Sequence, residues 1–334
     1  MVVSMPDGET FQDTDAELIE VLKSLKTSIK IFGCGGSGSN TITRIMEEGI
    51  QGADIVAANT DAQHLLLTQA SKKILLGKRT TRGLGAGAIP QIGELSAREA
   101  ELDINSAVEG ADIVFITAGM GGGTGTGSAP VVAEVAKNAG ALVISVVTTP
   151  FKSEGAMRKE NALWGLEKLK EKSDTIVIIP NDKLLEIVPR LPLNEAFRFA
   201  DETLMKSIKG LTELVTKPGL VNLDFNDLKT VMKDGGTAMI GMGQSGSQER
   251  ALEAAKKALN SPLLDLEVST ATSAIVSVTG SSNMSVEEAH AVLEEVRKKI
   301  NPNARIIWGA RIDESMKNDI KVLAILVGAK NKYI

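Results

Sequence analysis

The sequence feature that most constrains the fold is the glycine-rich segment GGGTGTG at residues 121–127. An apolar run at residues 113–118 precedes it, as in a buried strand, and residues 128–130 after it open a helical pattern. Five glycines and two threonines form a loop without bulky side chains, so its backbone N–H groups can close on an anion. A flexible linker seldom lies between a buried strand and a helix. The segment therefore predicts a phosphate-binding turn, helped by the positive end of the helix dipole.

A second glycine-rich segment, GCGGSGSN at residues 33–40, directly follows a predicted strand. It contains the spacing GxGxxG, so a dinucleotide-binding Rossmann turn, and with it an NAD-dependent oxidoreductase, is an alternative. The acidic residue expected about 20 positions later would be Asp54, which opens the next predicted strand and so lies at the wrong end. Asn59 and Asp61, at the carboxyl end of that strand, are better placed to meet a ligand. A Rossmann turn also leaves GGGTGTG unexplained.

The phosphate charge needs cations from outside these two segments. No Walker P-loop is present, and neither glycine-rich segment carries a cationic side chain. A triphosphate would therefore be met by N–H groups, helix dipoles, a divalent cation and an arginine from elsewhere. A third segment of small residues at 80–87 is either a border of the terminal phosphate or an ordinary mobile loop.

Strands and helices alternate along the first part of the chain. Strands are predicted at residues 28–32, 54–58, 73–76, 112–118, 142–148 and 175–179, and helices between them include 40–48, 91–109 and 155–172. Runs such as residues 143–147 are apolar on both faces, as in parallel strands covered by helices. This order predicts an α/β fold with a doubly wound, mostly parallel sheet.

The second part of the chain repeats the alternation after one long helix at residues 193–216. The predicted helices are 224–233, 248–259 and 286–300, and the predicted strands are 238–242, 273–280, 304–310 and 320–327. We therefore divide the chain into an N-terminal extension (1–27), a nucleotide-binding domain (28–192), the connecting helix (193–216) and a smaller α/β C-terminal domain (217–330).

Composition excludes several classes of function. A net charge of −5 and only 3% aromatic residues argue against nucleic-acid binding, which needs basic patches or stacking platforms. No apolar run approaches the roughly 20 residues that span a bilayer, and the acidic first residues do not resemble a secretory signal. The single Cys34 fits a reducing cytoplasm. It makes a zinc site with His64 and His290 improbable, so we assign no metal ligand and expect both histidines to be solvated helix residues.

A polar segment, NLDFND at residues 222–227, has two possible interpretations. Asp224 and Asp227 share one face of a first helical turn, where Asp224 or Asn222 can cap the helix and Asp227 can offset its dipole. Alternatively, the two carboxylates orient a water molecule toward a phosphorus atom. Spacing alone leaves both interpretations open.

These segments resemble the tubulin/FtsZ superfamily, and within it the archaeal branch of the FtsZ family of cell-division GTPases. The resemblance runs from about residue 28 to about residue 328 and rests on GCGGSGSN, NTDAQ, TRGLGAGA, GGGTGTG, IPNDKLL, AFRFAD and NLDFNDLK. It implies a Rossmann-like domain that binds GTP or GDP with Mg²⁺, a long connecting helix and a smaller C-terminal activation domain.

The resemblance also implies roles for individual residues. Phosphates would be held by the glycine-rich segments, ribose and phosphates by Glu154 and Arg158, and guanine by Asn40, Phe197 and Asp201. The complete nucleotide-binding set is Gly35, Gly36, Ser37, Gly38, Ser39, Asn40, Asn59, Asp61, Gly122, Gly123, Thr124, Gly125, Thr126, Gly127, Glu154, Arg158, Asn181, Phe197 and Asp201. An Asn amide and an Asp carboxylate can pair with guanine while Phe197 stacks on its ring.

Asn222, Asp224 and Asp227 correspond to the family's catalytic loop, which inserts into the nucleotide site of the next subunit. The implied product is a head-to-tail filament that forms the cytokinetic ring, located in the cytoplasm at mid-cell and bound to a membrane adaptor. Asn226 replaces the small residue usual between the two aspartates, and Ser37 and Ser39 replace Gly or Ala. The 334 residues do not include the spacer and tail peptide with which many members bind adaptors. A non-hydrolysing nucleotide-binding structural protein, with the aspartates as caps only, is the remaining alternative.

Overall fold

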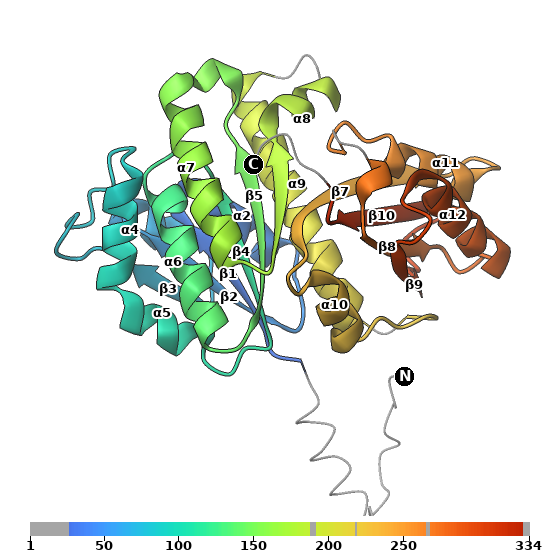
Figure 1. Cartoon of the computed structure of the whole chain (residues 1–334), viewed down its shortest axis with the longest axis horizontal. Helices are drawn as coiled ribbons and strands as arrows, with labels where there is room; N and C mark the ends of the chain where they lie inside the picture. Colours follow the sequence, from blue (N-terminus) through green and yellow to red (C-terminus); the bar gives the residue numbers. More distant parts are fainter. Residues whose placement is uncertain (1–26, 188–191, 218, 265–267, 330–334) are drawn as a thin grey trace, which may run out of the picture.

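The strands of the first half carry apolar side chains on both faces and build the centre of the structure. The computed structural model describes residues 27–187, 192–217, 219–264 and 268–329 (Figure 1). The predicted N-terminal extension therefore lies outside the described residues except for Thr27. Strands of the first half are β1 (Ile29–Cys34), β2 (Ala53–Asn59), β3 (Lys72–Leu75), β4 (Ile113–Gly119), β5 (Leu142–Thr149) and β6 (Thr175–Pro180).

Helices separate these strands and continue into a second unit. The first half contains α2 (Gly35–Glu47), α3 (Ala62–Leu67), α4 (Pro90–Glu99), α5 (Glu101–Val108), α6 (Thr124–Asn138), α7 (Ala156–Lys172) and α8 (Asn181–Ile187), with the 3-10 turn η1 (Lys152–Glu154). The rest contains α9 (Leu193–Thr216), α10 (Phe225–Met232), β7 (Gly236–Ser245), α11 (Arg250–Leu259), η2 (Val268–Thr270), β8 (Ser273–Gly280), α12 (Val286–Lys299), β9 (Arg305–Ile312) and β10 (Ile320–Val327).

All the strands of the described residues form one sheet in the order β3-β2-β1-β4-β5-β6-β7-β10-β8-β9. The strands from β3 to β7 are mutually parallel, and β8 is parallel to β9; only β10 runs antiparallel to its neighbours β7 and β8. The first six strands have the doubly wound order that places ligand sites at the carboxyl edge, where β1 meets β4. The predicted fold class is confirmed.

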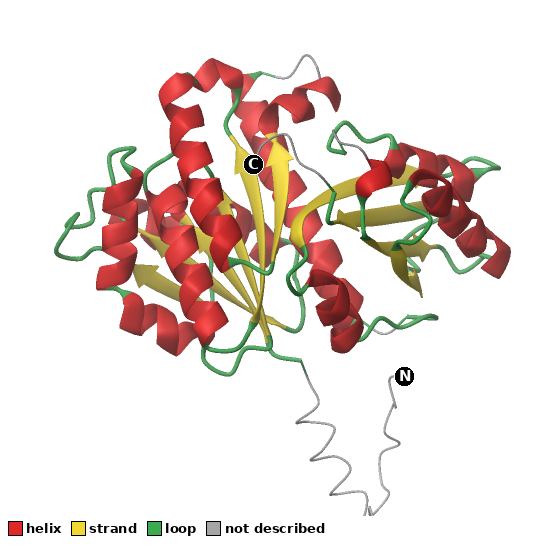
Figure 2. Ribbon diagram, in the orientation of Figure 1, coloured by secondary structure: helices red, strands yellow, loops and turns green. Residues whose placement is uncertain are grey.

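Alternate side chains of each central strand pack in two separate cores, one on each face of the sheet. Ile31 and Phe115 pack in a core with α2 and α9, whereas Phe32 and Ile116 pack in a core with α4 to α7. Figure 2 shows the sheet between these two layers of helices. A third core lies under α11 and α12 in the second unit. Because both faces are covered, the open position for a ligand is the carboxyl edge of the strands.

Both glycine-rich segments differ from the predicted loops. Helix α2 begins at Gly35 and α6 at Thr124, so most of each segment forms the first turns of a helix. Residues 128–130 do not open α6, because Pro130 lies inside it. Close packing overrides the poor helix propensity of glycine here. A Cβ on Gly127 would lie 2.0 Å from the carbonyl oxygen of Pro90, so only glycine lets α6 approach α4 this closely.

The single helix predicted at residues 91–109 is two helices, α4 and α5, which meet at Ala100. The uninterrupted apolar pattern gives no break there, since neither Gly nor Pro marks the junction. Helix α3 begins at Ala62, within NTDAQ, and was expected only as a helical setting for His64, without bounds. Its six residues are too few to show a helical period.

Helix α9 connects the two halves and has the predicted bounds, Leu193–Thr216. Its 24 residues extend about 36 Å. Leu204, Ile208 and Leu211 on its inner face are fully buried. Figure 1 shows the helix running from the end that holds α8 to the end that holds α10. Among the described helices, none combines the length and apolar character that a membrane span requires.

Candidate functional site

A cavity of about 250 Å³ opens at the carboxyl ends of β1, β4 and β5. Its position follows from the sheet, because Cys34 at the end of β1 pairs with Ala118, and Gly119 at the end of β4 pairs with Thr148. The predicted residues that line it are Gly36, Ser37, Gly122, Gly123, Thr124, Gly125, Glu154, Arg158, Asn181, Phe197 and Asp201. Residues from segments up to about 165 positions apart thus meet in one place.

The two glycine-rich turns pack against each other, and residues of both line this cavity. Gly35 has a φ of +71°, and a Cβ there would lie 2.6 Å from the backbone nitrogen of Gly125. Both turns open a helix, so the first N–H groups of α2 and α6 lack partners within their helices. Two sets of N–H groups and two positive dipole ends converge, which is an arrangement that binds phosphate.

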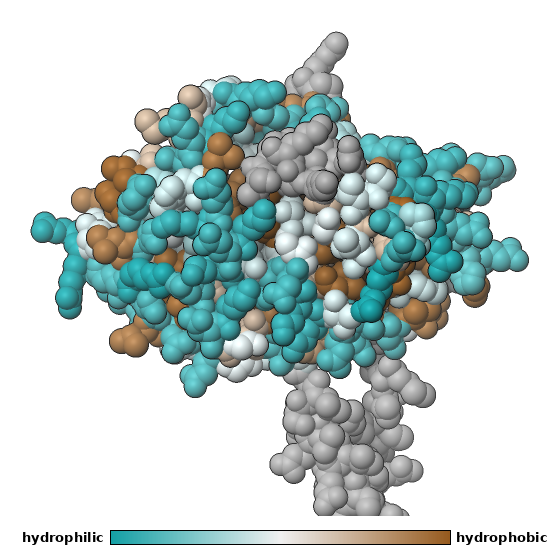
Figure 3. Space-filling model, viewed as in Figure 1, coloured by the Kyte–Doolittle hydropathy of each residue, from teal (hydrophilic) through white to brown (hydrophobic). Residues whose placement is uncertain are grey.

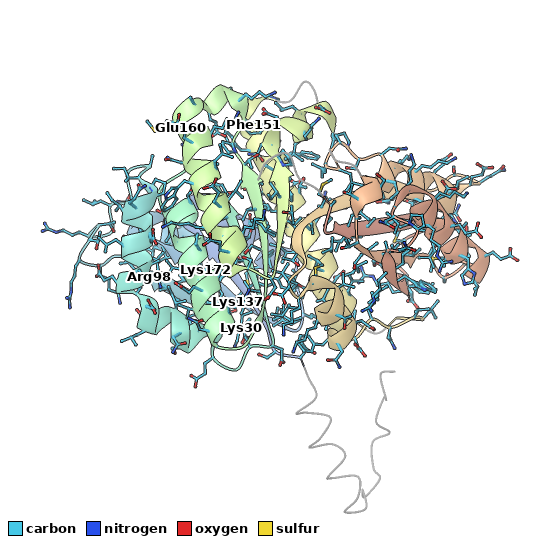
Figure 4. The ribbon with its side chains drawn as sticks, in the orientation of Figure 1. Lys30, Arg98, Lys137, Phe151, Glu160 and Lys172 are labelled. Atoms are coloured by element: carbon cyan, nitrogen blue, oxygen red, sulfur yellow. The ribbon has the colours of Figure 1, made fainter. Side chains whose placement is uncertain are left out.

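The wall of the cavity supplies the cation missing from the glycine-rich turns. Arg158 lies in the first turn of α7, and its Nη1 is 3.0 Å from Oε2 of Glu154. The other oxygen of Glu154, Oε1, accepts a hydrogen bond of 2.9 Å from the backbone N–H of Phe151. Figure 4 labels Phe151 and Glu160 at the upper end of the molecule and Lys30, near the start of β1, at the lower end. The guanidinium is half exposed and can meet an anion in the cavity.

The opposite wall comes from the first turns of α9. Phe197 is 38% exposed, which is unusual for a phenylalanine, and meets Phe151 edge to face at 5.2 Å between ring centroids. Asp201 is buried, and its Oδ1 accepts a hydrogen bond of 3.1 Å from the hydroxyl of Ser37. Burial raises the pKa of the Asp201 carboxyl to about 6, against the opposing effects of Ser37, the Arg44 cation and the Asn40 amide. An aromatic face and a carboxylate thus flank one space, as a purine site requires.

Asn181 supplies a further polar group at the end of β6. This residue is 5% exposed and lines the cavity, and its Oδ1 has no hydrogen-bond partner among the described residues. A buried polar atom without a partner costs free energy unless a ligand or water satisfies it. A molecule bound in the cavity, or a water molecule, would satisfy this amide oxygen.

Other predicted residues surround the cavity without lining it. Gly38 and Gly127 are packing positions, since a Cβ on either would lie within 2.6 Å of backbone oxygen. Ser39 and Thr126 are fully buried, and the Thr126 hydroxyl accepts a 2.9 Å hydrogen bond from the N–H of Gly121. Gly35 joins the two turns as described above. The remaining predicted residues outside the lining are Asn40, Asn59 and Asp61.

A histidine that the sequence did not single out joins these last residues. The ring of His64 lies 3.0 Å from Oδ1 of Asn40 and 3.1 Å from Nδ2 of Asn59, and Asp61 caps α3 by accepting from the N–H of His64. His64 is therefore bound to site residues and is not simply a solvated helix residue. Its place three residues after Asp61, in the turn that follows a strand end, is the signal that was available.

Asn222, Asp224 and Asp227 do not approach the cavity. Asp224 caps α10, where its Oδ1 accepts a 2.8 Å hydrogen bond from the N–H of Asp227, and Oδ2 of Asp227 accepts in return from the N–H of Asp224. Asn222 Oδ1 accepts from the N–H of Gly219. The hydrogen bonds predicted by the capping interpretation are thus present. These residues follow the C-terminal end of α9, whereas Phe197 and Asp201 lie near its start.

We expect Asp201→Asn to weaken GTP binding by about 10- to 50-fold, because the variant would lose the charge-assisted pair with guanine that the family resemblance implies for this carboxylate. The same change should stabilise the nucleotide-free protein by about 1 to 3 kcal/mol at pH 7, since the pKa of the buried carboxyl is raised. The folded-state pKa lies above the unfolded value, so the ionised carboxyl costs stability above pH 6, and this cost disappears as pH falls toward 4. Because the Asp201 carboxyl becomes protonated below about pH 6, the GTP affinity of the unmodified protein should fall below that pH.

Titrations of both proteins with GTP between pH 5 and 8, with thermal melts in parallel, test this prediction. Equal GTP affinity of the two proteins at pH 7 would contradict it, and so would a variant less stable than the unmodified protein.

Comparison with known proteins identifies relatives over most of the chain. Residues 28–189 match the Tubulin/FtsZ family, GTPase domain, and residues 236–330 match the FtsZ family, C-terminal domain. Cell division protein FtsZ 1 of Archaeoglobus fulgidus is 56% identical over 328 residues, which are 98% of this chain and 89% of that protein. The corresponding protein of Thermococcus kodakarensis is 56% identical over 330 residues, 99% of this chain and 88% of that protein.

Solved structures agree with these matches. A structure described as an empty FtsZ dimer from M. jannaschii superposes with a TM-score of 0.90 at 55% identity, covering 95% of this chain and 93% of that chain. CetZ2 from Haloferax volcanii, at 19% identity, superposes with a TM-score of 0.79 over 91% of this chain and 94% of that chain. The second likeness concerns the fold alone.

Proposed function

The chain belongs to the tubulin/FtsZ family of GTPases, and on that premise we propose that it hydrolyses GTP, polymerises head to tail and forms the ring of prokaryotic cell division. The observation that carries the proposal is the position of two sets of residues at opposite ends of α9. The cavity lies at one end of this helix, and the acidic pair Asp224 and Asp227 follows the other.

One chain cannot bring these two sets together, because the helix from Asp201 to Thr216, about 22 Å long, separates them. Stacking a second copy along the axis of α9 places the acidic pair of one copy over the cavity of the next. Such a heterologous contact does not close on itself and produces an open filament. An NAD-dependent oxidoreductase would not explain the second glycine-rich turn or the acidic pair, and the family match argues against this alternative.

Exposed apolar side chains near both ends support this contact. Next to the cavity, Leu84 is 86% exposed and Met157 is 68% exposed; Leu84 is bridged to Asp61, and Met157 precedes Arg158. Next to the acidic pair, Leu220 is 69% exposed. The face shown in Figure 3 is mostly hydrophilic, with separate brown groups on the side of α4 and over the second unit. A partner that covers both ends would remove these side chains from water.

The chemistry would consist of positioning and charge stabilisation. Backbone N–H groups of the two glycine-rich turns and the Arg158 guanidinium would hold the phosphates, while Asp224 and Asp227 of a second copy would orient the attacking water. Phe197 would stack on guanine, and Asp201 with Asn40 would accept and donate hydrogen bonds along its edge. Asn222 would fix the loop that carries the acidic pair, through its bond to Gly219.

Mg²⁺ would neutralise charge on the phosphates when bound. Within the described ranges, no group of three or more His, Cys, Asp or Glu side chains is arranged to hold a metal ion. This fits Mg²⁺ held mainly by phosphate oxygens and water, its usual mode in nucleotide sites. The phosphates themselves would be fixed by the turn at Gly122 to Gly125.

The non-hydrolysing structural protein is the second candidate, and the capping box at Asp224 and Asp227 is the observation in its favour.

The proposal also includes the domain division, a partner and a location. The domains are residues 28–192, 193–216 and 217–330. The protein would bind a membrane adaptor and would lie in the cytoplasm at mid-cell. Fluorescence imaging of the tagged chain in dividing cells tests the location; a diffuse signal throughout division would contradict it.

We expect GTP turnover per subunit to rise steeply with protein concentration, because each active site needs two copies. Phosphate release measured over a dilution series, with light scattering after addition of GTP and Mg²⁺, provides the test. GDP in place of GTP is the control and should give no scattering increase. Turnover strictly proportional to protein at every dilution would instead indicate a complete site in each chain.

A further inference from the structure

A continuous series of hydrogen bonds runs from the end of β2 to the Asn40 side chain, which is near the Asp201 carboxylate. Oδ1 of Asn59 accepts from the backbone N–H of Asp61 at 3.3 Å, and Nδ2 of Asn59 lies 3.1 Å from Nδ1 of His64. Nε2 of His64 lies 3.0 Å from Oδ1 of Asn40, and the Asn40 amide is near enough to the Asp201 carboxyl to oppose the rise of its pKa on burial. Asn59 is 2% exposed and forms the fixed end of this series.

The fixed end determines the direction of every later bond. Because Oδ1 of Asn59 accepts from Asp61, its Nδ2 must donate, so Nδ1 of His64 accepts and carries no proton. The proton of the neutral imidazole is then on Nε2, which donates to Oδ1 of Asn40. Asn40 is thereby oriented with its Oδ1 toward His64, which leaves its NH₂ group for Asp201, although Asn40 itself is exposed.

We propose that His64 is a positioning residue for guanine recognition, which holds the Asn40 amide in the one orientation that serves both Asp201 and the base. The inference rests on the proposed function, since it concerns the same nucleotide site. His64 itself does not line the cavity, and its ring lies 3.9 Å from the position of a Cβ on Gly36. It acts through Asn40 and not by contact with the nucleotide.

If the ring of His64 served only to stabilise the fold, we would expect it to contact the core or the end of α3 and not two side chains of the site. Its backbone N–H already closes the cap of α3 on Asp61, so the helix end does not need the ring. Within the described residues, the ring nitrogens form hydrogen bonds only with the two asparagine side chains. Loss of the ring should therefore affect the selectivity for the base far more than the stability of the fold.

The test compares GTP with ATP, since both carry the same triphosphate and ribose. For His64→Ala we expect GTP affinity to fall by about 10-fold, with ATP affinity changed by less than about 2-fold, because the guanine contact is a charge-assisted hydrogen bond. His64→Gln should restore the preference for GTP, since its amide can donate to Asn40 and accept from Asn59. His290→Ala on α12, where the ring meets Trp308, is the matched control and should match the unmodified protein.

Equilibrium binding of fluorescent GTP and ATP, with thermal melts of each variant, gives every readout. An unchanged GTP-to-ATP affinity ratio in folded His64→Ala would overturn the inference, and so would a His64→Gln variant without a preference for GTP. If His64→Ala does not fold, the Gln variant alone decides. An unmodified protein without preference for GTP would instead contradict the proposed function, so the two failures are distinguishable.

Discussion

Asp227→Ala is expected to lower GTP turnover by about 10²-fold or more while GTP binding is retained, because groups that position an attacking water have effects of this size. The carboxylate lies beyond the far end of α9 from the cavity, so its removal cannot disturb nucleotide contacts within the same chain. Phosphate release at polymerising concentration and GTP binding to the same preparation are the two measurements.

The capping role of the pair requires a separate control, since a lost cap costs about 1 kcal/mol of stability. Asp224→Ser keeps a side-chain oxygen that can accept from the N–H of Asp227 but removes the carboxylate. We expect this variant to melt like the unmodified protein and yet to lose most turnover. Normal turnover in both Asp224→Ser and Asp227→Ala would reduce the pair to helix caps and favour the non-hydrolysing alternative.

Gly35→Ala is expected to weaken GTP binding by about 10²-fold or more, because Gly35 joins the two phosphate-binding turns. Its Cβ would lie 2.6 Å from the nitrogen of Gly125, and its φ of +71° strains any other residue. Either the turns separate or the N–H groups of α6 turn away from the phosphate position. Isothermal titration with GTP measures the loss.

Gly49→Ala is the matched control, since Gly49 has a φ of +70° just beyond the opposite end of α2 and nothing within 4 Å of its Cβ position. It carries the same backbone strain, worth about 1 kcal/mol, without the clash. GTP affinity should be unchanged in this variant. An equal loss of affinity in both variants would show that strain in α2, and not the contact between the turns, accounts for the effect.

The sequence predicted the fold class because the physical signals were strong and local. Apolar strands between helical periods, and a stop at Lys217 followed by Pro and Gly, located α9 at its observed bounds. The cavity was predicted in outline because glycine-rich turns at strand ends have few structural uses other than anion binding. The roles of Glu154, Arg158, Phe197 and Asp201 came from family resemblance, since nothing local distinguishes these residues from ordinary surface or core positions.

The errors arose where tertiary packing decided the local structure. Gly35 and Thr124 begin helices because their backbones pack against one another and against α4, and no single-segment pattern contains that information. The break at Ala100 and the short α3 have the same origin. His64 was missed because its partners, Asn40 and Asn59, belong to separate segments that only the sheet brings together. The separation of Asp227 from the cavity likewise depends on the direction of α9.

The central claim is that each active site combines the cavity of one copy with the acidic pair of another, and mixing two defective variants tests it most directly. Asp201→Asn impairs the cavity and leaves the acidic pair intact, whereas Asp227→Ala does the reverse. In an equimolar mixture, at a GTP concentration that fills the unmodified cavity but leaves most Asp201→Asn cavities empty, we expect about a quarter of the unmodified turnover, since about one contact in four pairs an intact cavity with an intact acidic pair. A mixture no more active than the mean of the two separate variants would contradict the claim.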